Sequence, residues 1–198
     1  GRVIDPKNKR DEVVDLLVER GKIAEIGKGL SANGAEVVQA GGLWVVPGLI
    51  DMHVHLRQPG REYAETILSG SRAAAKGGFT TLVPMANTDP VTDNRGAVEF
   101  ILSEAKRVGL VNIFPVGAVT QGLKGEALSE MGELAEAGCV AFSDDGKPVR
   151  DTKLMQHALE YAAMCGLPII AHEEDPYLFE GGVMNEGPMS TVLGLVGI

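Results

Sequence analysis

The chain has 198 residues and a formal net charge of −9, and 44% of its residues are hydrophobic. This composition predicts a soluble globular protein with a sizeable core and argues against disorder. The acidic balance argues against nucleic acid or an anionic membrane as a partner, because both require a basic surface. No apolar run approaches the ~20 residues that a membrane span needs.

Residues 1–46 are predicted to form a small β-rich segment at the N-terminus. Its clearest signal is a hairpin, in which the apolar stretch 13–19 is followed by the turn Arg20-Gly21-Lys22 and a returning stretch 23–26. Such a segment is too small to be a robust domain alone, so we expect it to pack against other parts of the protein. The chain opens without a methionine, and we expect it to be trimmed at this end. Further short strands are expected at 2–4, 37–38 and 43–46.

From residue 47 onward a regular alternation of helix, glycine and apolar strand begins. Each expected helix is followed by a glycine, the residue type that most readily adopts the left-handed conformation that ends helices. Repeated units of this kind predict a parallel sheet covered by helices. The expected helices are 68–76, 96–108, 127–137 and 152–165, and the strands that follow them are 79–83, 111–116, 139–142 and 168–171.

Two parallel architectures fit this alternation, an open sheet and a closed barrel. A glycine-rich phosphate loop after the first strand would favour the open sheet, and the sequence has none. Polar residues instead follow several strands, as in the active sites of (β/α)8 barrels. We therefore predict an α/β fold, a TIM-type (β/α)8 barrel over residues 47–198. A whole barrel needs roughly 250 residues, so about the first five strands are expected here and the chain is expected to be a portion of a larger protein.

The stretch from Pro47 to Arg57 carries the strongest functional signal. Along an extended strand its apolar residues fall on one side, and Asp51, His53 and His55 fall on the other. A buried strand rarely carries three polar groups on one face unless something binds them. Two imidazoles two residues apart can converge on one ion, although histidines can also be hydrogen-bonded core residues. We predict a metal site here, with Asp51 behind it as an orienting group.

Other polar residues at strand ends are expected to meet this pair. His172 follows the fifth strand and is expected to be a further ligand. Asp144 and Asp145 follow the fourth strand, where they either form a turn or supply one carboxylate that bridges two metal ions. Arg57 and Asn87 are either ordinary surface and turn residues or groups that hold a substrate carboxylate.

The two cysteines, Cys139 and Cys165, fall in no metal or redox motif. We expect both to be buried, reduced thiols of a cytoplasmic protein.

Several motifs resemble those of one known family, the bacterial type I dihydroorotases of the amidohydrolase superfamily, over their N-terminal portion. The likeness covers essentially the whole chain and is specific in combination. The barrel motifs that carry it are PGLIDMHVHLRQPG (47–60), MANTDPVTDN (85–94), AFSDDGKPV (141–149) and AHEED (171–175), and GRVIDP and VERGKIAEIG resemble the preceding β-rich segment.

The resemblance implies a zinc-dependent enzyme that reversibly closes N-carbamoyl-L-aspartate to L-dihydroorotate in pyrimidine synthesis. It implies that His53 and His55 bind one Zn²⁺, that Asp145 bridges or shares it, and that His172 belongs to a second metal position, so that one or two ions are bound. Arg57 and Asn87 would then grip the substrate α-carboxylate.

The resemblance also implies that one catalytic part is missing. The family takes its general acid/base carboxylate from the eighth strand and another histidine from the sixth, both expected beyond Ile198. The fragment alone is therefore expected to be inactive. Aspartate transcarbamoylase is a possible partner, because some bacterial relatives bind it, and a homo-oligomer is expected.

The sequence leaves two alternatives open. One is a hydantoinase- or allantoinase-like cyclic amidohydrolase, which the aspartate at 145 disfavours because those relatives usually carry a carboxylated lysine there, whereas Lys147 lies further out. The other is a catalytically inactive dihydroorotase-like subunit that scaffolds aspartate transcarbamoylase.

Overall fold

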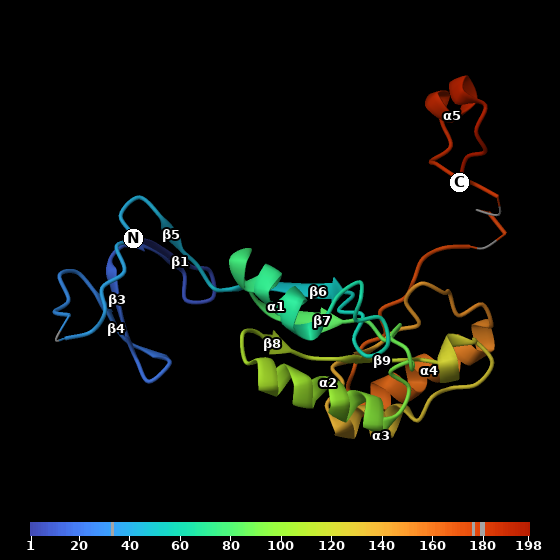
Figure 1. The fold of residues 1–198 in the computed structure, drawn as a ribbon, viewed down its shortest axis with the longest axis horizontal. Coiled ribbons are helices and arrows are strands. Elements are labelled where there is room, and N and C mark those ends of the chain that lie inside the picture. The colour runs from blue at the N-terminus through green and yellow to red at the C-terminus, as the bar shows by residue number, and fades with distance from the viewer. Residues whose placement is uncertain (33, 176, 179–180) are drawn as a thin grey trace. The chain divides into compact units, whose positions relative to one another are not determined.

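In the computed structural model, which describes residues 1–32, 34–175, 177–178 and 181–198, the chain divides into two compact units. They are Gly1–Leu49 and Ile50–Ile198 (Figure 1). None of the described helices is long and apolar enough to cross a membrane.

The first unit consists of short β-strands with little buried apolar surface. The expected hairpin is present, and its turn places Arg20 at φ 51° and Gly21 at φ 74°, the left-handed pair that a two-residue hairpin turn requires. Val3 and Val14 are the buried apolar side chains among its described residues. The strands pair as β2 (Arg10–Val13) antiparallel to β1 (Arg2–Asp5), β1 parallel to β5 (Trp44–Val45), and β3 (Asp15–Glu19) antiparallel to β4 (Lys22–Gly27).

One predicted strand of this unit is wrong. Val37 and Val38 lie in no strand and are exposed, so two adjacent β-branched residues were not sufficient to build a ladder there.

The second unit alternates strands and helices, as expected. Its strands are β6 (Leu49–Val54), β7 (Phe79–Pro84), β8 (Asn112–Ile113), β9 (Val116–Gly117) and β10 (Ala141–Phe142). Its helices are α1 (Ile67–Lys76), α2 (Arg95–Val108), the 3-10 turn η1 (Gln121–Leu123), α3 (Met131–Ala137), α4 (Thr152–Cys165) and α5 (Pro188–Leu193).

The strands of this unit form two sheets, and within each sheet neighbouring strands are consecutive in the chain. One sheet has the order β6-β7-β8, and β9 pairs with β10 in parallel. Pro115 separates β8 from β9, because proline has no N–H to donate to a ladder. Beyond β10, the expected fifth strand is reduced to a parallel bridge between Phe142 and Ile169.

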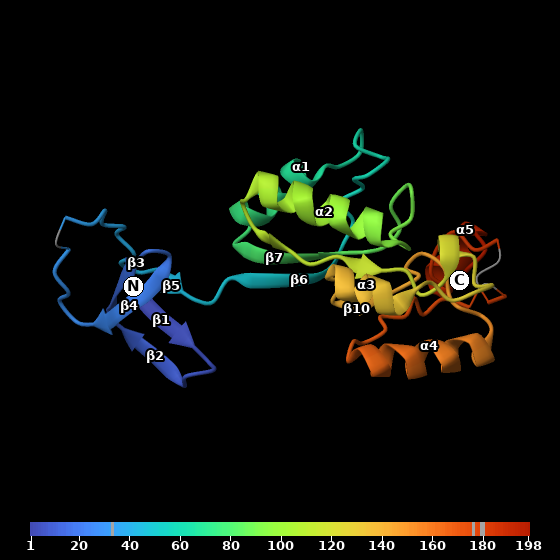
Figure 2. The ribbon, with the colours of Figure 1, turned by 90° about the horizontal axis from the view of Figure 1, so that it is seen from below.

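Helices α1 and α2 cover one face of the β6-β7-β8 sheet (Figure 2). Between them lies a core of buried apolar side chains that includes Leu56, Ile67, Leu82 and Ile101. Val54 packs on this core, whereas Ile50 and Met52 are 62% and 69% exposed. The apolar side predicted for β6 is thus buried only toward its C-terminal end, next to the two histidines.

A second core lies under α3 and α4. Phe142, Met131 and Leu134 are fully buried there, and α4 contributes Ala158 and Ala162. Side-chain caps start α2 and α4, where Asn94 accepts a hydrogen bond from the Ala97 N–H and Asp151 from those of Lys153 and Leu154.

The predicted bounds of α2 and α4 agree with the structure within one residue, and α3 is the exception. It begins at Met131 rather than at residue 127, because Leu128 forms an antiparallel bridge with Thr120. Gly109, Gly138 and Gly166 end their helices in the left-handed conformation, as expected. After α1 it is Gly78, one residue past the cap, that has a positive φ.

The two cysteines are both free thiols but differ in burial. Cys139 is buried, and burial raises the pKa of its thiol to about 12. Cys165 is only half-buried, which corrects the expectation that both are buried.

We predict that iodoacetamide at pH 8 labels Cys165 in the folded chain and leaves Cys139 unmodified, because the reactive species is the thiolate. Peptide mass mapping before and after denaturation checks this, with the denatured chain as the control in which both thiols react. Labelling of Cys139 at the rate of Cys165 in the folded chain would contradict the burial described here.

Candidate metal centre

Strand β6 carries His53, and His55 follows directly after the end of the strand at Val54. The two side chains lie close together, with their rings 5.4 Å apart between centroids at an interplanar angle of 77°. Asp51 accepts a hydrogen bond of 3.1 Å from the backbone N–H of His53. The predicted orienting group therefore contacts the main chain rather than an imidazole.

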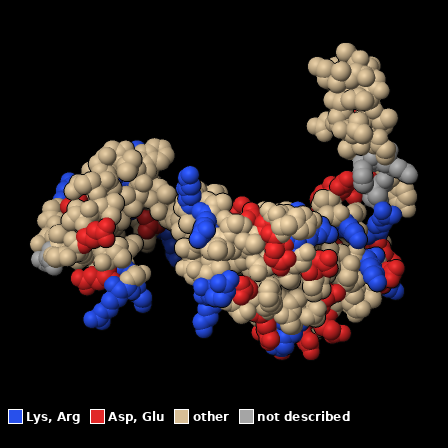
Figure 3. Space-filling view, viewed as in Figure 1, with Lys and Arg blue, Asp and Glu red and all other residues tan. Residues whose placement is uncertain are grey.

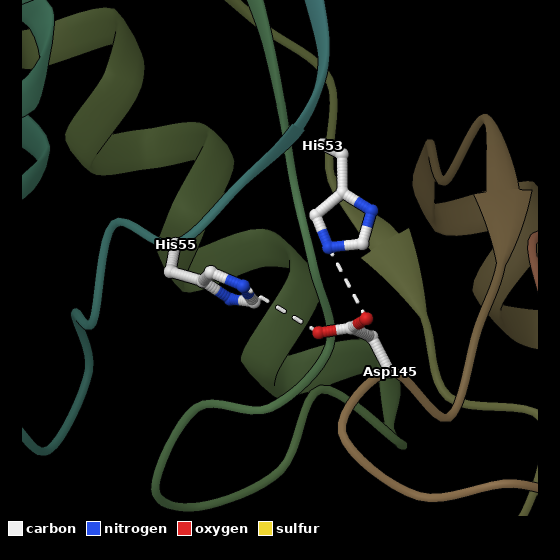
Figure 4. Close-up of side chains that lie close together, drawn as sticks. All are labelled: His53, His55 and Asp145. Carbon is white, nitrogen blue, oxygen red and sulfur yellow. Dashed lines mark ion pairs between the residues drawn. The ribbon is translucent and has the colours of Figure 1, made fainter. Parts of the chain in front are cut away.

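Asp145 reaches the two histidines from the loop that follows β10. Its Oδ1 lies 3.1 Å from His53 Nε2 and its Oδ2 lies 3.5 Å from His55 Nε2 (Figure 4). The carboxylate is 9% exposed, while the His53 side chain is 47% exposed, so the group is anchored in the protein and open to solvent on one side. The Asp145 N–H donates to Ser143 Oγ at 3.0 Å, which fixes the backbone at this point.

These three side chains fit a divalent metal ion. One ligand atom from each of His53, His55 and Asp145 lies within 4.8 Å of the other two. Ligand atoms in a tetrahedral zinc site, each about 2.0–2.1 Å from the ion, lie about 3.3 Å from one another. The two distances from Asp145 to the histidines, 3.1 Å and 3.5 Å, are close to that value. Two imidazoles and a carboxylate form a donor set that suits zinc and other first-row divalent ions.

Asn87 links two members of this group. Its Oδ1 lies 3.0 Å from His55 Nδ1, and its Nδ2 lies 3.3 Å from both the backbone oxygen and Oδ2 of Asp145. With Nδ1 engaged by the amide oxygen, His55 directs Nε2 toward Asp145. The residue predicted to bind substrate thus also contacts the metal-site side chains.

His172 meets the group at Asp145 only. Its Nδ1 lies 3.4 Å from Asp145 Oδ1, and its Nε2 lies 2.7 Å from Glu174 Oε2. His172 is not part of the three-residue group in which all ligand atoms lie within 4.8 Å of one another. Asp145 is therefore the common neighbour of His53, His55 and His172.

Arg57 follows the histidines along the chain and has an unusual backbone, with φ at 57°. Among the residues that the structure describes, its guanidinium forms no hydrogen bond or ion pair, so its donors are available to an anion.

The two adjacent aspartates of this loop have separate environments. Asp144 is 4% exposed and turns away from the histidines, accepting hydrogen bonds from the N–H groups of Val119 (2.8 Å) and Thr120 (3.0 Å) and from the Thr120 hydroxyl. Burial raises the pKa of this carboxyl above its ordinary value, although the hydrogen bonds oppose the shift. Asp144 ties the end of β9 to the end of β10, and Asp145 faces the histidines.

Lys147 lies outside the cluster. Its backbone N–H donates to the Asp144 carbonyl at 2.9 Å, and its side chain is exposed.

The charged side chains on the face of the molecule drawn in Figure 3 are of both signs and interspersed, and the described residues form no continuous basic patch on that face.

Comparison with solved structures identifies the class of fold. The D-hydantoinase (dihydropyrimidinase) of Thermus sp. matches 87% of this chain over 38% of its own, with 27% sequence identity and a TM-score of 0.67. The L-hydantoinase of Arthrobacter aurescens matches 88% of this chain over 39% of its own, with 26% identity and a TM-score of 0.64. The chain thus has an α/β fold of the hydantoinase kind.

Sequence comparison identifies the family. The model of the family described as dihydro-orotase-like matches residues 42–198. The dihydroorotase of Geobacter sulfurreducens is 61% identical over the whole chain, and that of Acetivibrio thermocellus is 52% identical. The chain belongs to the dihydro-orotase-like family. It spans about half the length of the curated relatives that it matches, 47% and 46% of these two.

Substitution of the two adjacent aspartates is expected to affect different properties, folding stability for Asp144 and zinc binding for Asp145. Asp144→Ala leaves three buried donors without an acceptor and is expected to lower the free energy of unfolding by about 2–4 kcal/mol. Asp145→Ala is expected to abolish tight zinc binding and to change stability far less. Urea denaturation and zinc titration of both variants check this, with the exposed α4 residue His157 changed to Ala as the control for binding.

The raised pKa of Asp144 determines the direction in which its contribution to folding stability changes with pH. Because the folded state holds this proton more tightly than the unfolded state, the stability that Asp144 contributes decreases as pH rises from the ordinary aspartate pKa through the folded-state value. Asp144→Asn is expected to remove that decrease. If the free energy of unfolding of this variant depends on pH as it does in the parent chain, the raised pKa of Asp144 is contradicted.

Proposed function

We propose that this chain is the N-terminal part of a dihydroorotase, an enzyme that reversibly cyclises N-carbamoyl-L-aspartate to L-dihydroorotate in de novo pyrimidine biosynthesis. The observation that carries the proposal is the convergence of His53, His55 and Asp145 in a chain of the dihydro-orotase-like family. In this proposal residues 1–46 are a β-rich segment and residues 47–198 form about the first five strands of a (β/α)8 barrel.

The metal of the proposed enzyme is zinc, with one or two ions per active site. His53 and His55 would hold the first ion, and Asp145 would share it. His172 would belong to the second position, and the contact that Asp145 makes with all three histidines supports its role as the bridging ligand. A divalent ion at this position supplies Lewis-acid chemistry, since it makes water more acidic and polarises a carbonyl.

The residues of the chain itself bind and orient the substrate in this proposal. Arg57 pairs with the α-carboxylate, which its unengaged guanidinium can grip through two parallel hydrogen bonds. Asn87 donates from Nδ2, whose contacts to Asp145 are both 3.3 Å long and leave room for a better acceptor. The reacting ring is thereby held beside the carboxylate of Asp145.

A proton must also reach the leaving nitrogen, and the general acid/base carboxylate for this step is proposed to lie beyond Ile198. We therefore propose that the 198-residue chain alone is inactive. We also propose that the whole enzyme is cytoplasmic, that it forms a homo-oligomer, and that it binds aspartate transcarbamoylase.

The alternatives have less support. Hydantoinases share the fold at 26–27% identity, whereas dihydroorotases are up to 61% identical to the chain among the relatives described above. A scaffold subunit without activity is expected to lose metal ligands, and here the four proposed ligands are retained.

The test uses the chain in two forms, alone and extended by the C-terminal half of the Geobacter sulfurreducens dihydroorotase. The extended form is expected to hydrolyse dihydroorotate with zinc and to lose activity on chelation, and the chain alone is expected to show no turnover. Turnover of hydantoin but not of dihydroorotate by the extended form would overturn the proposal.

Arg57 is predicted to act in substrate binding. In the extended form, Arg57→Lys is expected to raise KM for dihydroorotate about tenfold or more, because an ammonium group cannot form the two parallel hydrogen bonds of a guanidinium. Steady-state kinetics measure this. The neighbouring exposed Arg61 changed to Lys is the control, and equal effects of the two substitutions would contradict the assignment.

A further inference from the structure

His172 is held between two carboxylates, one at each ring nitrogen. Nδ1 faces Asp145 Oδ1 at 3.4 Å, toward the proposed metal centre. Nε2 faces Glu174 Oε2 at 2.7 Å, a distance typical of a strong hydrogen bond. The ring therefore has a defined orientation, with Nδ1 inward and Nε2 outward.

This orientation has a chemical consequence. A neutral imidazole carries one proton, and a carboxylate can only accept a hydrogen bond. Of the two contacts, the 2.7 Å contact to Glu174 has the length of a hydrogen bond and the 3.4 Å contact to Asp145 is longer, so the geometry favours the tautomer with the proton on Nε2 and the lone pair on Nδ1. A metal ion binds the nitrogen that carries the lone pair, and the partner of the other nitrogen fixes which one that is.

The local backbone favours this contact. The N–H of Glu174 donates to the carbonyl of His172 at 3.0 Å, so the two residues lie in a tight turn that brings their side chains together. Both side chains are half-buried, 27% exposed for His172 and 39% for Glu174. The adjacent Glu173 is exposed, and among the described residues it makes no hydrogen bond to the ring.

We propose that Glu174 is a positioning residue of the metal centre. It accepts the Nε2–H of His172, holds the ring in one tautomer and one orientation, and so leaves Nδ1 free to bind the ion beside Asp145. This inference rests on the proposed metal centre and adds to it a residue outside the predicted ligands.

The experiment measures zinc affinity of the 198-residue chain by competition with a chromophoric chelator. Loss of an outer carboxylate partner typically weakens metal binding 10–100-fold, so Glu174→Ala is expected to lower affinity by about that factor. Glu174→Gln keeps an oxygen acceptor without the charge and is expected to lose less. Glu173→Gln, which removes the neighbouring charge, is the matched control and is expected to bind like the parent chain.

A second readout separates positioning from a general structural effect. Nitrogen-15 spectra of labelled histidine report which ring nitrogen carries the proton. In the zinc-loaded parent chain His172 is expected to be protonated at Nε2 and metal-bound at Nδ1. In Glu174→Ala the same signals are expected to show a mixture of tautomers before zinc is added, whereas circular dichroism stays unchanged.

The outcomes distinguish this inference from the proposed metal centre. If His53→Ala and His172→Ala weaken zinc binding but Glu174→Ala stays within twofold of the parent chain, the role of Glu174 is overturned and the metal centre stands. Zinc bound at Nε2 of His172, or directly by Glu174, also overturns it. If none of the histidine substitutions changes zinc affinity, the metal centre itself fails.

Discussion

A single carboxylate holds the candidate site together. Asp145 contacts imidazoles from two distant parts of the chain, His53 in β6 with His55 just after it, and His172 from beyond β10. A carboxylate that is only 9% exposed is costly to bury without partners, and here its partners are groups that ligate metals. Hydrogen bonds accepted by Asp144 and Ser143 fix the loop after β10 and so hold the carboxylate in this position.

The fold supplies that rigidity. Asp144 binds the backbone of Val119 and Thr120, and Ser143 binds the backbone of Asp145, so the ends of β9 and β10 are tied to each other. Asn87 adds a link from the end of β7 to both His55 and Asp145. Parallel strands that end at the same edge let four separate chain segments contribute to one site, the arrangement found in barrel enzymes.

Much of this could be predicted from the sequence, and the failures have identifiable causes. The alternation of the stretch around β6 was sufficient to bring His53 and His55 to the same carboxylate, although the strand itself ends at Val54. Which of Asp144 and Asp145 faces them could not be decided from the residues alone, because the choice depends on the loop at Val119 and Thr120. The predicted start of α3 was wrong because Leu128 pairs with Thr120, and helix propensity contains no information about this contact. Glu174 was overlooked as a partner of His172 because the turn that joins them has no spacing signal.

The proposed metal centre depends on Asp145 as a shared ligand, and anomalous X-ray diffraction at the zinc edge tests this role most directly. Crystals of the chain grown with zinc are predicted to show an ion about 2.0–2.2 Å from an Asp145 oxygen and from Nε2 of His53 and His55. A second ion, if bound, is predicted between Asp145 and Nδ1 of His172. An ion held elsewhere, with Asp145 uncoordinated, would contradict this role of Asp145.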